Sequence, residues 1–476
     1  MRKWDVVILG ANSGGILAGA LLAKKGFSVL IVEEKAKAGT PRRKYRFRRF
    51  SNLSELLVSR HVVEGIYQWL GIPIARGEFA HRGDLTCQII LPGHRVDISP
   101  HWSDLLEQMR SEFPRDFDLI ETFYARLGEE DWVRRTMMAT GDEKTFLGRI
   151  GGRLVREYHA LSDRPLSAFL APLRKNKALA RFMDVQMKSM SYLFMEDSPF
   201  GLARHLMGIL VQDDVLMDMM GPQGLMDRVK GEVVRGGGRI IALKSIEEIR
   251  IEKSEEGFRI TTNGKGQPMA SRVCIGTIPF RQLRKLIPTA FSGRKWAERG
   301  EGLWPKYFIF SLNLGIDAGG IPVGLGDCFI SLRDVEAPYE NGNLLMACMG
   351  PEGVGAPPGK RSMTINTFVP VGDAAGIEGI IQEMLNHVLE VAPFLDRSIR
   401  VMDGRPPTEG YRGQWTNSDI IYGGTLPFRV GDAILPTTTP LEGLYLASRE
   451  NFPYLGFEGE ILSGMKAAQA ILSHFS

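Results

Sequence analysis

The feature that most constrains this chain is a short apolar run followed at once by a glycine-rich turn near its start. Residues 5–9 are rich in β-branched side chains and predict a strand, which leads into the turn 10–15, GANSGG. Residues 16–25 have a helical pattern, and residues 28–32 predict a second strand that ends at Glu33. Strand, turn, helix and strand in this order predict a βαβ unit with two parallel strands.

The turn of this unit predicts a dinucleotide site. Gly10 and Gly15 stand at the first and last positions of G-x-G-x-x-G, where close packing leaves no room for a side chain. Asn12 replaces the middle glycine, so its side chain has to point away or donate from its amide to phosphate. Glu33, 23 residues after Gly10, can accept hydrogen bonds from both ribose hydroxyls and would repel a 2′-phosphate. The residues expected to contact the nucleotide are Gly10, Asn12, Ser13, Gly14, Gly15, Glu33 and Glu34.

Length and composition indicate a soluble globular protein. A chain of 476 residues is too long for one ordinary core, so two packed domains are expected. The hydrophobic share of 44%, the charged share of 24% and the mean hydropathy of -0.09 are typical of soluble proteins, and no segment predicts a membrane span. A net charge of +4 from 59 basic and 55 acidic residues does not indicate nucleic-acid binding.

The four cysteines are scattered without C-x-x-C spacing, which argues against a zinc site or a disulfide framework and fits a reducing compartment. The apolar N-terminal stretch resembles a secretory signal only superficially, because polar and glycine residues at 12–15 interrupt it. Its pattern also continues into the second strand. We therefore expect a cytoplasmic protein.

The rest of the chain predicts a second, mixed part. Residues 51–225 are mainly helical in pattern, with a strand signal at 87–91. Further strands are predicted at 272–276, 306–314, 344–349 and 362–369, and helices at 378–391 and 460–475, the last after a strand at 443–447.

The expected fold class is α/β, or α+β overall, with a discontinuous Rossmann-type cofactor domain. We assign residues 1–60, 215–295 and 435–476 to that domain. Residues 61–214 and 296–434 would form an inserted substrate domain of antiparallel sheet plus helices.

Several further motifs resemble one known family. They are the turn 221–225 (GPQGL), the stretch 236–240 (GGGRI), residues 277–279 (TIP) and the C-terminal segment 443–470. In this order they resemble the phytoene desaturase, carotenoid isomerase and retinol saturase branch of the flavin amine-oxidase superfamily. The resemblance implies FAD as cofactor, hydride transfer at flavin N5 and a hydrophobic polyene or isoprenoid substrate.

The resemblance also implies cofactor contacts near the C-terminus. Arg449 stands where the family usually has Asp, so either Glu450 takes that role or Arg449 meets the pyrophosphate. Glu458 and Glu460 are acids at the start of a helix where the family is usually neutral, and they either carry a proton or cap that helix. The backbone of Ile246 would meet adenine. The turn residues expected near the flavin are Gly456, Phe457 and Gly459.

The substrate side offers three features, each with an ordinary structural alternative. Nine of the 20 methionines lie between Met183 and Met226, and they either line a tunnel for an apolar substrate or form a Met-rich core. Tyr422, with Tyr411 and Trp415, either faces the flavin as a weak catalytic candidate or packs in the substrate sheet.

The third feature is a basic run at residues 42–49, which carries six cations in eight residues. Arg42 or Arg43 would reach the FAD phosphates in the way that the family's arginine does. The remaining cations would dock the protein on an anionic membrane surface or belong to a solvated loop.

No other chemistry is indicated. The eight histidines show no H-x-H or H-E-x-x-H spacing, so no metal is expected, and no G-x-S-x-G or Walker-type loop occurs. The alternatives to a desaturase-type enzyme are an amine or porphyrinogen oxidase of the same superfamily, or a degenerate member that binds a lipid or a partner without turnover. The expected partner is a small hydrophobic substrate, and the sequence leaves the oligomeric state open.

Overall fold

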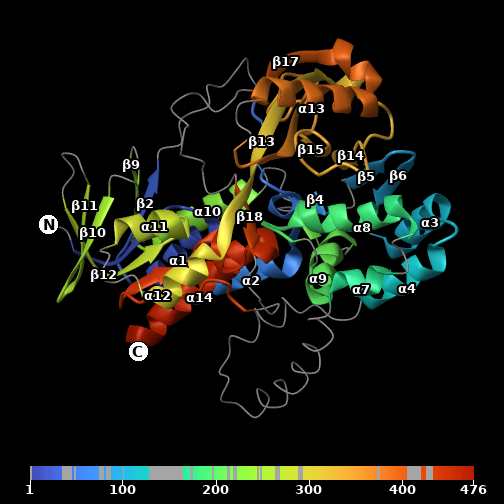
Figure 1. Ribbon diagram of the computed structural model, residues 1–476. Coiled ribbons are helices and arrows are strands. Elements are labelled where there is room, and N and C mark those ends of the chain that lie inside the picture. Colours follow the sequence, from blue (N-terminus) through green and yellow to red (C-terminus); the bar gives the residue numbers. More distant parts are fainter. Residues whose placement is uncertain are drawn as a thin grey trace.

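The computed structural model contains two large sheets with helices packed around them (Figure 1). The residues that it describes are 3–34, 45–47, 50–73, 80–81, 87–99, 101–127, 165–171, 175–195, 198–211, 215–217, 222–243, 246, 249–262, 268–287, 293–372, 376–404, 420–424 and 432–475. Within these ranges no helix is both long and apolar enough to cross a bilayer.

The first sheet is built around the N-terminal strand. Its order is β10-β11-β12-β1-β2-β9, and β19 pairs with the carboxyl half of β12. Strands β1, β2, β9, β12 and β19 are mutually parallel, whereas β10 and β11 form an antiparallel edge. The strands are β1 (Lys3–Leu9), β2 (Val29–Glu34), β9 (Arg239–Leu243), β10 (Ile249–Ser254), β11 (Gly257–Thr262), β12 (Met269–Gly276) and β19 (Leu444–Leu446).

Helix α1 (Ser13–Lys24) connects β1 to β2 and packs against α10 (Pro222–Arg235) and α14 (Gly456–Phe475). Val6, Ile8 and Leu9 of β1 are fully buried, as a parallel strand covered on both faces requires. The same part of the molecule holds α2 (Arg60–Leu70), α11 (Phe280–Leu286) and α12 (Arg294–Glu301).

The second sheet has nine strands in the order β6-β5-β14-β15-β16-β13-β18-β7, with β17 beside β13. Most of its pairs are antiparallel, but β5 with β14 and β18 with β7 are parallel. Helix α13 (Ile377–Val391) packs on it through a separate apolar cluster. The strands are β5 (Cys87–Leu91), β6 (His94–Ile98), β7 (Leu193–Phe194), β13 (Leu303–Asp317), β14 (Cys328–Leu332), β15 (Leu344–Met349), β16 (Lys360–Pro370), β17 (Ile399–Asp403) and β18 (Ile420–Gly424).

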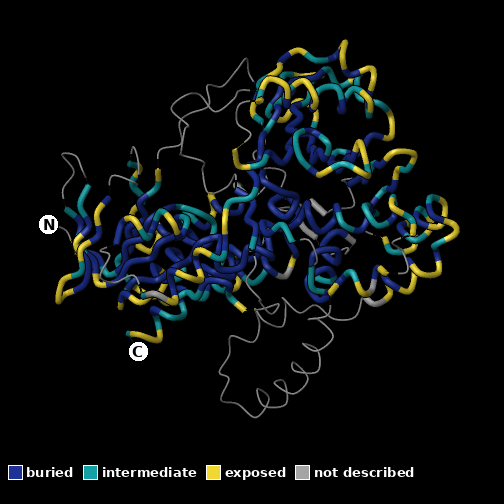
Figure 2. The backbone as a smooth tube through the Cα atoms, viewed as in Figure 1, coloured by how far each residue is buried: buried dark blue, intermediate teal, exposed yellow. Residues whose placement is uncertain are grey.

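A helical group lies beside the second sheet, and its inner surfaces are buried (Figure 2). It consists of α3 (Trp102–Glu112), α4 (Phe117–Leu127), α7 (Leu166–Leu170), α8 (Lys177–Met190) and α9 (Phe200–Val211). A small sheet joins β3 (Val58–Ser59), β8 (Val215–Met217) and β4 (Ala80–His81). Short 3-10 helices include η1 (Leu53–Glu55), η8 (Pro393–Ser398), η11 (Arg449–Asn451) and η12 (Pro453–Leu455).

The predicted fold class is confirmed: a Rossmann-type parallel sheet is combined with a second, largely antiparallel sheet and helices. The strands predicted at 87–91 and 344–349 have those bounds. The C-terminal helix begins at Gly456, four residues before the predicted start, because the glycine-rich segment continues directly into it. The proposed domain bounds stay a prediction.

Candidate cofactor site

The carboxyl ends of the parallel strands in the first sheet gather at one edge. Residue Gly10 follows β1, Glu33 lies at the end of β2, Thr277 follows β12 and Ala447 follows β19. Open sheets of this kind bind ligands in the crevice outside these ends. The edge therefore brings together N-terminal and C-terminal residues that lie more than 400 positions apart in the sequence.

The glycines of the first turn are required by close packing. Gly10 has a φ of +103°, and a Cβ there would lie 2.4 Å from Oγ1 of Thr277. A Cβ on Gly15 would lie 2.6 Å from Cγ2 of the same threonine, and one on Gly14 would lie 2.4 Å from the carbonyl oxygen of Glu460. The turn thus fits tightly between β12 and helix α14, as the pattern of the first and last glycines predicts.

Asn12 caps helix α1. Its Oδ1 accepts a hydrogen bond of 2.7 Å from the backbone N–H of Gly15, and its Nδ2 donates one of 3.2 Å to the carbonyl of Ala447. A capping side chain satisfies one of the backbone donors that a helix N-terminus would otherwise offer to an anion. Asn12 and Ser13 are half-buried, so this end of the helix stays reachable.

Glu33 lies at the same carboxyl edge with its carboxylate partly accessible. Its Oε2 is 3.3 Å from Nζ of Lys230 on α10, and the two side chains are 32% and 27% exposed. A partly exposed ion pair of this kind is worth little, so the carboxylate can exchange Lys230 for other donors. Glu34 is the exposed last residue of β2.

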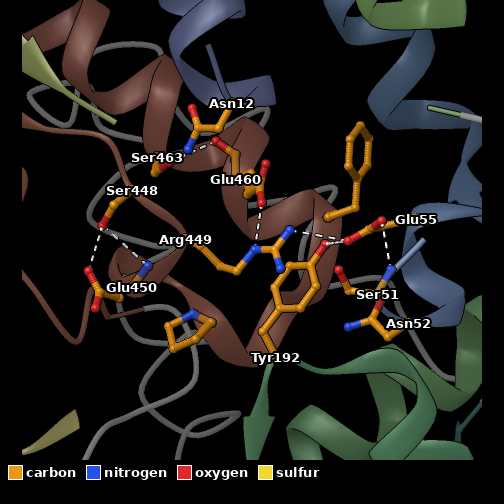
Figure 3. Close-up of polar contacts among 12 residues, drawn as sticks. Asn12, Ser51, Asn52, Glu55, Tyr192, Ser448, Arg449, Glu450, Glu460 and Ser463 are labelled. Atoms are coloured by element: carbon orange, nitrogen blue, oxygen red, sulfur yellow. Dashed lines mark hydrogen bonds and ion pairs between the residues drawn. The ribbon is translucent and has the colours of Figure 1, made fainter. Parts of the chain in front are cut away.

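Arg449 begins η11, directly beyond β19, and its side chain is buried in an ion-pair group (Figure 3). Nε of Arg449 is 2.7 Å from Oε1 of Glu460, and Nη2 is 3.1 Å from Oε1 of Glu55. The guanidinium carbon lies 3.4 Å from the centre of the Tyr192 ring, and the Tyr192 hydroxyl donates to Glu55 at 2.7 Å. We call Arg449, Glu55, Glu460 and Tyr192 the Arg449 cluster.

Burial sets the electrostatics of this cluster. Burial raises the pKa of Glu55, although the charge of Arg449 and the hydrogen bond from Tyr192 oppose the shift. Burial alone would lower the pKa of Arg449, but Tyr192, Glu460 and Glu55 raise it above its usual value. Arg449 is therefore a permanent buried cation held between two carboxylates.

Glu450 faces the opposite way from Arg449. Its Oε2 accepts a short hydrogen bond from the backbone N–H of Phe280, and Ser448 Oγ lies 3.4 Å from the same oxygen. Burial raises the pKa of Glu450 to about 7, opposed by hydrogen bonds from Phe280, Tyr422 and Ser448. Burial and the nearby Glu450 in turn raise the pKa of Tyr422, which is buried on β18.

The two acids at the start of α14 bind other elements. Glu458 Oε1 accepts from the backbone N–H of Ser59 at 3.1 Å, and Oε2 lies 3.1 Å from Nε2 of His205 on α9. Burial alone would raise the pKa of Glu458, but His205 and Ser59 bring it below its usual value. Glu460 pairs with Arg449 as described. Both acids therefore pair with other elements, and their role in carrying a proton or capping the helix stays a prediction.

The start of α14 also fits closely against its surroundings. Gly456 has a φ of +58°, and a Cβ there would lie 2.2 Å from Oγ of Ser54. That hydroxyl accepts the backbone N–H of Phe457 at 2.9 Å. A Cβ on Gly459 would lie 2.1 Å from the carbonyl oxygen of Phe452.

Of the other expected site residues, some lie outside the described residues and some are buried. Arg42, Arg43, Tyr411 and Trp415 lie outside the described residues. Ile246, which lies between β9 and β10 in the sequence, is buried. Within the basic run, Tyr45 is buried against Ala356 and Val401 near the second sheet, so this aromatic packs on the protein itself.

The described methionines of α8 and α9 belong to the interior. Met183 and Met190 on α8 and Met207 on α9 are fully buried within the main apolar core. These positions fit the Met-rich core that the sequence offered as an alternative to a substrate tunnel.

Three cysteines that are far apart in the sequence lie side by side in the second sheet. Cys328 on β14 is opposite Cys348 on β15 and Cys87 on β5, and the sulfur atoms of Cys328 and Cys348 are 2.8 Å apart. All are buried free thiols. Among the described residues, no group of three or more His, Cys, Asp or Glu side chains is arranged to hold a metal ion.

The sequence missed two members of the Arg449 cluster. Glu55 lies in η1 and Tyr192 lies between α8 and β7, and neither carries a local motif that marks a partner of Arg449. Such buried pairing arises only when distant segments meet. The one sequence signal was Arg449 itself, a cation where an acid is usual, because a buried cation needs anionic partners.

Comparison with known proteins supports the fold. Neither protein-family models nor curated proteins give a match to the sequence. Among solved structures, an oxidoreductase from Methanosarcina mazei is similar with a TM-score of 0.66 and 16% identity, over 98% of this chain and 100% of that one. Cyclohexylamine oxidase from Brevibacterium oxydans gives 0.62 and 14%, covering both chains fully. A putrescine oxidase bound to putrescine gives 0.60 and 14%, with 99% of each chain covered. At these identities the likeness concerns the fold.

Proposed function

We propose that this protein is an FAD-dependent oxidoreductase. The observation that carries the proposal is the arrangement at the carboxyl edge of the first sheet, where the N-terminus of α1 and the carboxylate of Glu33 lie at the ends of adjacent parallel strands. A helix N-terminus favours phosphate, and an acid at the end of the second strand suits a ribose with free hydroxyls. The similar solved structures with oxidoreductase and amine oxidase names agree with this class.

The residues at this edge of the sheet would each contact a different part of FAD. Glu33 would accept hydrogen bonds from the adenosine ribose, and the first turn of α1 would face the diphosphate. Close packing of Gly10, Gly14 and Gly15 holds that turn in place. FAD, when bound, would supply a ring that accepts or returns a hydride.

The two halves of FAD meet different surroundings. The adenosine and diphosphate half fits the accessible groups Glu33, Asn12 and Ser13. The flavin half would extend toward η11, where Arg449, Glu55 and Glu460 are buried and paired with one another. The cation of Arg449 suits the diphosphate charge once one of these pairs opens.

For the substrate we propose a hydrophobic polyene or isoprenoid that is desaturated, isomerised or saturated. The resemblance along the chain supports this choice. Helices α8 and α9 bury Phe182, Met183 and Met207 in the main apolar core, and apolar surroundings of this kind exclude water from a reacting carbon chain.

A second candidate is oxidation of an amine. Near η11 the structure buries three carboxylates: Glu55 and Glu460 pair with Arg449, and Glu450 faces the other way. An excess of acidic groups beside Tyr192 and Tyr422 favours a cationic ligand over a neutral one. Two of the similar solved structures are amine oxidases by name.

The test of the proposed function is binding of FAD by the purified protein. We expect a flavin absorption spectrum that is perturbed relative to free FAD, with one FAD per chain. Glu33→Gln should weaken binding about tenfold, because a hydrogen bond to a charged group is worth about 1.5–3 kcal/mol. Glu256→Gln, which alters an exposed ion pair with Lys3, serves as the control. Anaerobic bleaching by polyenes or by amines then separates the two candidates, and a protein that refuses FAD contradicts both.

A further inference from the structure

The Arg449 cluster lies immediately beside the expected diphosphate position. Glu460 approaches the first turn of α1 so closely that a Cβ on Gly14 would lie 2.4 Å from its carbonyl oxygen. Asn12, at the start of the same helix, donates to the carbonyl of Ala447, two residues before Arg449. Figure 3 shows Asn12, Glu460 and Arg449 next to one another. The cluster therefore borders the nucleotide crevice.

The strand order fixes the direction in which a bound dinucleotide would run. Strand β2, which ends at Glu33, lies on one side of β1, and β12 with β19 lies on the other. With the adenosine ribose at Glu33 and the diphosphate at α1, the second half of the molecule has to continue past β1 toward the ends of β12 and β19. Arg449 begins the segment that follows β19.

The side chain of Arg449, which follows β19, and the side chains that pair with it are buried. The side chains of Arg449 and Glu460 are each 6% exposed, and that of Glu55 is 11% exposed. Asn52 and Ser51, on the loop that positions Glu55, are also buried, and the backbone N–H of Ser51 donates to Oε2 of Glu55 at 3.0 Å. The side chain of Glu33, by contrast, is 32% exposed.

We propose that the Arg449 cluster closes the flavin half of the site, so that its ion pairs have to part before the ring of FAD enters, while the adenosine and diphosphate half stays open. This inference rests on the proposed function. It identifies Glu55 as a positioning residue that holds Arg449 across the route.

The chemistry of Arg449 explains how the closed arrangement can open. Its Nη1 is buried without a hydrogen-bond partner, while Nε and Nη2 are held by carboxylates. An unsatisfied buried donor disfavours the closed state. A diphosphate at the N-terminus of α1 would compete with Glu55 for the guanidinium, because phosphate accepts two parallel hydrogen bonds from arginine. Binding of the first half of FAD thus weakens the cluster that blocks the second half.

The proposal predicts different binding kinetics for a short and a long ligand. ADP needs only the open half, so its association rate should rise linearly with concentration. FAD also needs the cluster to part, so its loading rate should reach a plateau set by opening. The full-length apoprotein, freed of any resident flavin, is mixed with FAD in a stopped-flow instrument, and loading is followed by quenching of flavin fluorescence.

The decisive variant is Glu55→Gln, which removes one charge from the cluster but keeps an acceptor for Tyr192. Loss of one partner of a buried ion pair should raise the plateau rate about tenfold or more and leave ADP association unchanged. The matched control is Glu390→Gln. Glu390 is one of two glutamates that pair with the exposed Arg333, so this variant removes one charge from an exposed arrangement of the same kind. It should leave both rates unchanged. If Glu55→Gln does not fold, Tyr192→Phe removes the hydroxyl that holds Glu55 and should also raise the plateau.

The outcomes separate the two proposals. A plateau for FAD but not ADP, raised by Glu55→Gln or Tyr192→Phe, supports closure by the cluster. FAD loading that is linear in concentration, or a plateau unchanged in both variants, overturns the closure and leaves the proposed function intact. Binding of ADP with no binding of FAD to the wild type or either variant overturns both.

Discussion

The guanidinium of Arg449 stacks 3.4 Å above the ring of Tyr192, whose hydroxyl donates to Glu55, a carboxylate that also pairs with Arg449. The three side chains come from η11, the α8–β7 connection and η1, so they join three distant segments of the chain. The two carboxylates and the aromatic ring together stabilise the buried cation. Removal of any one charged partner leaves another charge buried and unpaired.

Removal of the cation should therefore be costly. Arg449→Leu leaves the buried carboxylates of Glu55 and Glu460 without their cationic partner and should reduce the free energy of unfolding by about 3–5 kcal/mol, measured by urea denaturation. Arg333→Leu, which removes an exposed arginine that likewise bridges two glutamates, should cost no more than about 1 kcal/mol. Adding Glu55→Gln and Glu460→Gln to Arg449→Leu should recover part of the loss. Equal effects of the two arginine changes would contradict this account.

The stability of the protein should depend on pH through Glu450. Its pKa is about 7 in the folded protein against an ordinary value of 4.5, so the folded state binds more protons than the unfolded state between these values. This contribution is complete below pH 4.5 and is lost as the pH rises to 7, with a total of ~3 kcal/mol. The difference in unfolding free energy between the wild type and Glu450→Gln, measured across this range, should show that slope. A constant difference would rule out the raised pKa.

The contact between helices α1 and α14 should depend on glycine. A Cβ on Gly464 would lie 2.0 Å from the carbonyl oxygen of Gly14, so Gly464→Ala should separate the helices and reduce the free energy of unfolding by about 3 kcal/mol. At position 379, an exposed position on α13, an added Cβ meets no atom within 4 Å, so Gly379→Ala should stabilise the protein by about 0.5–1 kcal/mol. Thermal unfolding distinguishes the two, and equal melting temperatures would contradict the predicted contact.

The cap on α1 should compete with phosphate. Asn12→Gly frees the N–H of Gly15, so ADP should bind several-fold more tightly in calorimetry, at a cost to stability of only a few tenths of a kcal/mol. Asn176→Gly removes the corresponding cap from α8 and should leave ADP affinity unchanged. Weaker ADP binding by Asn12→Gly would mean instead that the amide of Asn12 donates to phosphate.

Local pattern was sufficient to predict the βαβ unit. Residues 5–9 and 28–32 are rich in β-branched apolar side chains, and glycines at positions 10 and 15 permit the tight turn. Sequence neighbours were therefore enough to predict strand, turn and helix. The strands β5 and β15 were predicted at their bounds for the same reason.

Long-range pairing explains what the sequence could not predict. The two-residue strand β7 exists because Leu193 and Phe194 meet β18, more than 200 residues later. Arg449 was recognised as unusual, but its partners Glu55 and Tyr192 are 394 and 257 positions away, and no spacing rule connects them. A buried carboxylate such as Glu55 resembles a surface residue until the fold encloses it.

Binding of FAD to the full-length protein tests the central claim most directly. The apoprotein is titrated with FAD while the flavin spectrum and fluorescence are recorded, with ADP as competitor. We expect saturation at one FAD per chain, a perturbed flavin spectrum and displacement of FAD by ADP. Absence of FAD binding by both the wild type and Glu55→Gln, in preparations that still bind ADP, would contradict it.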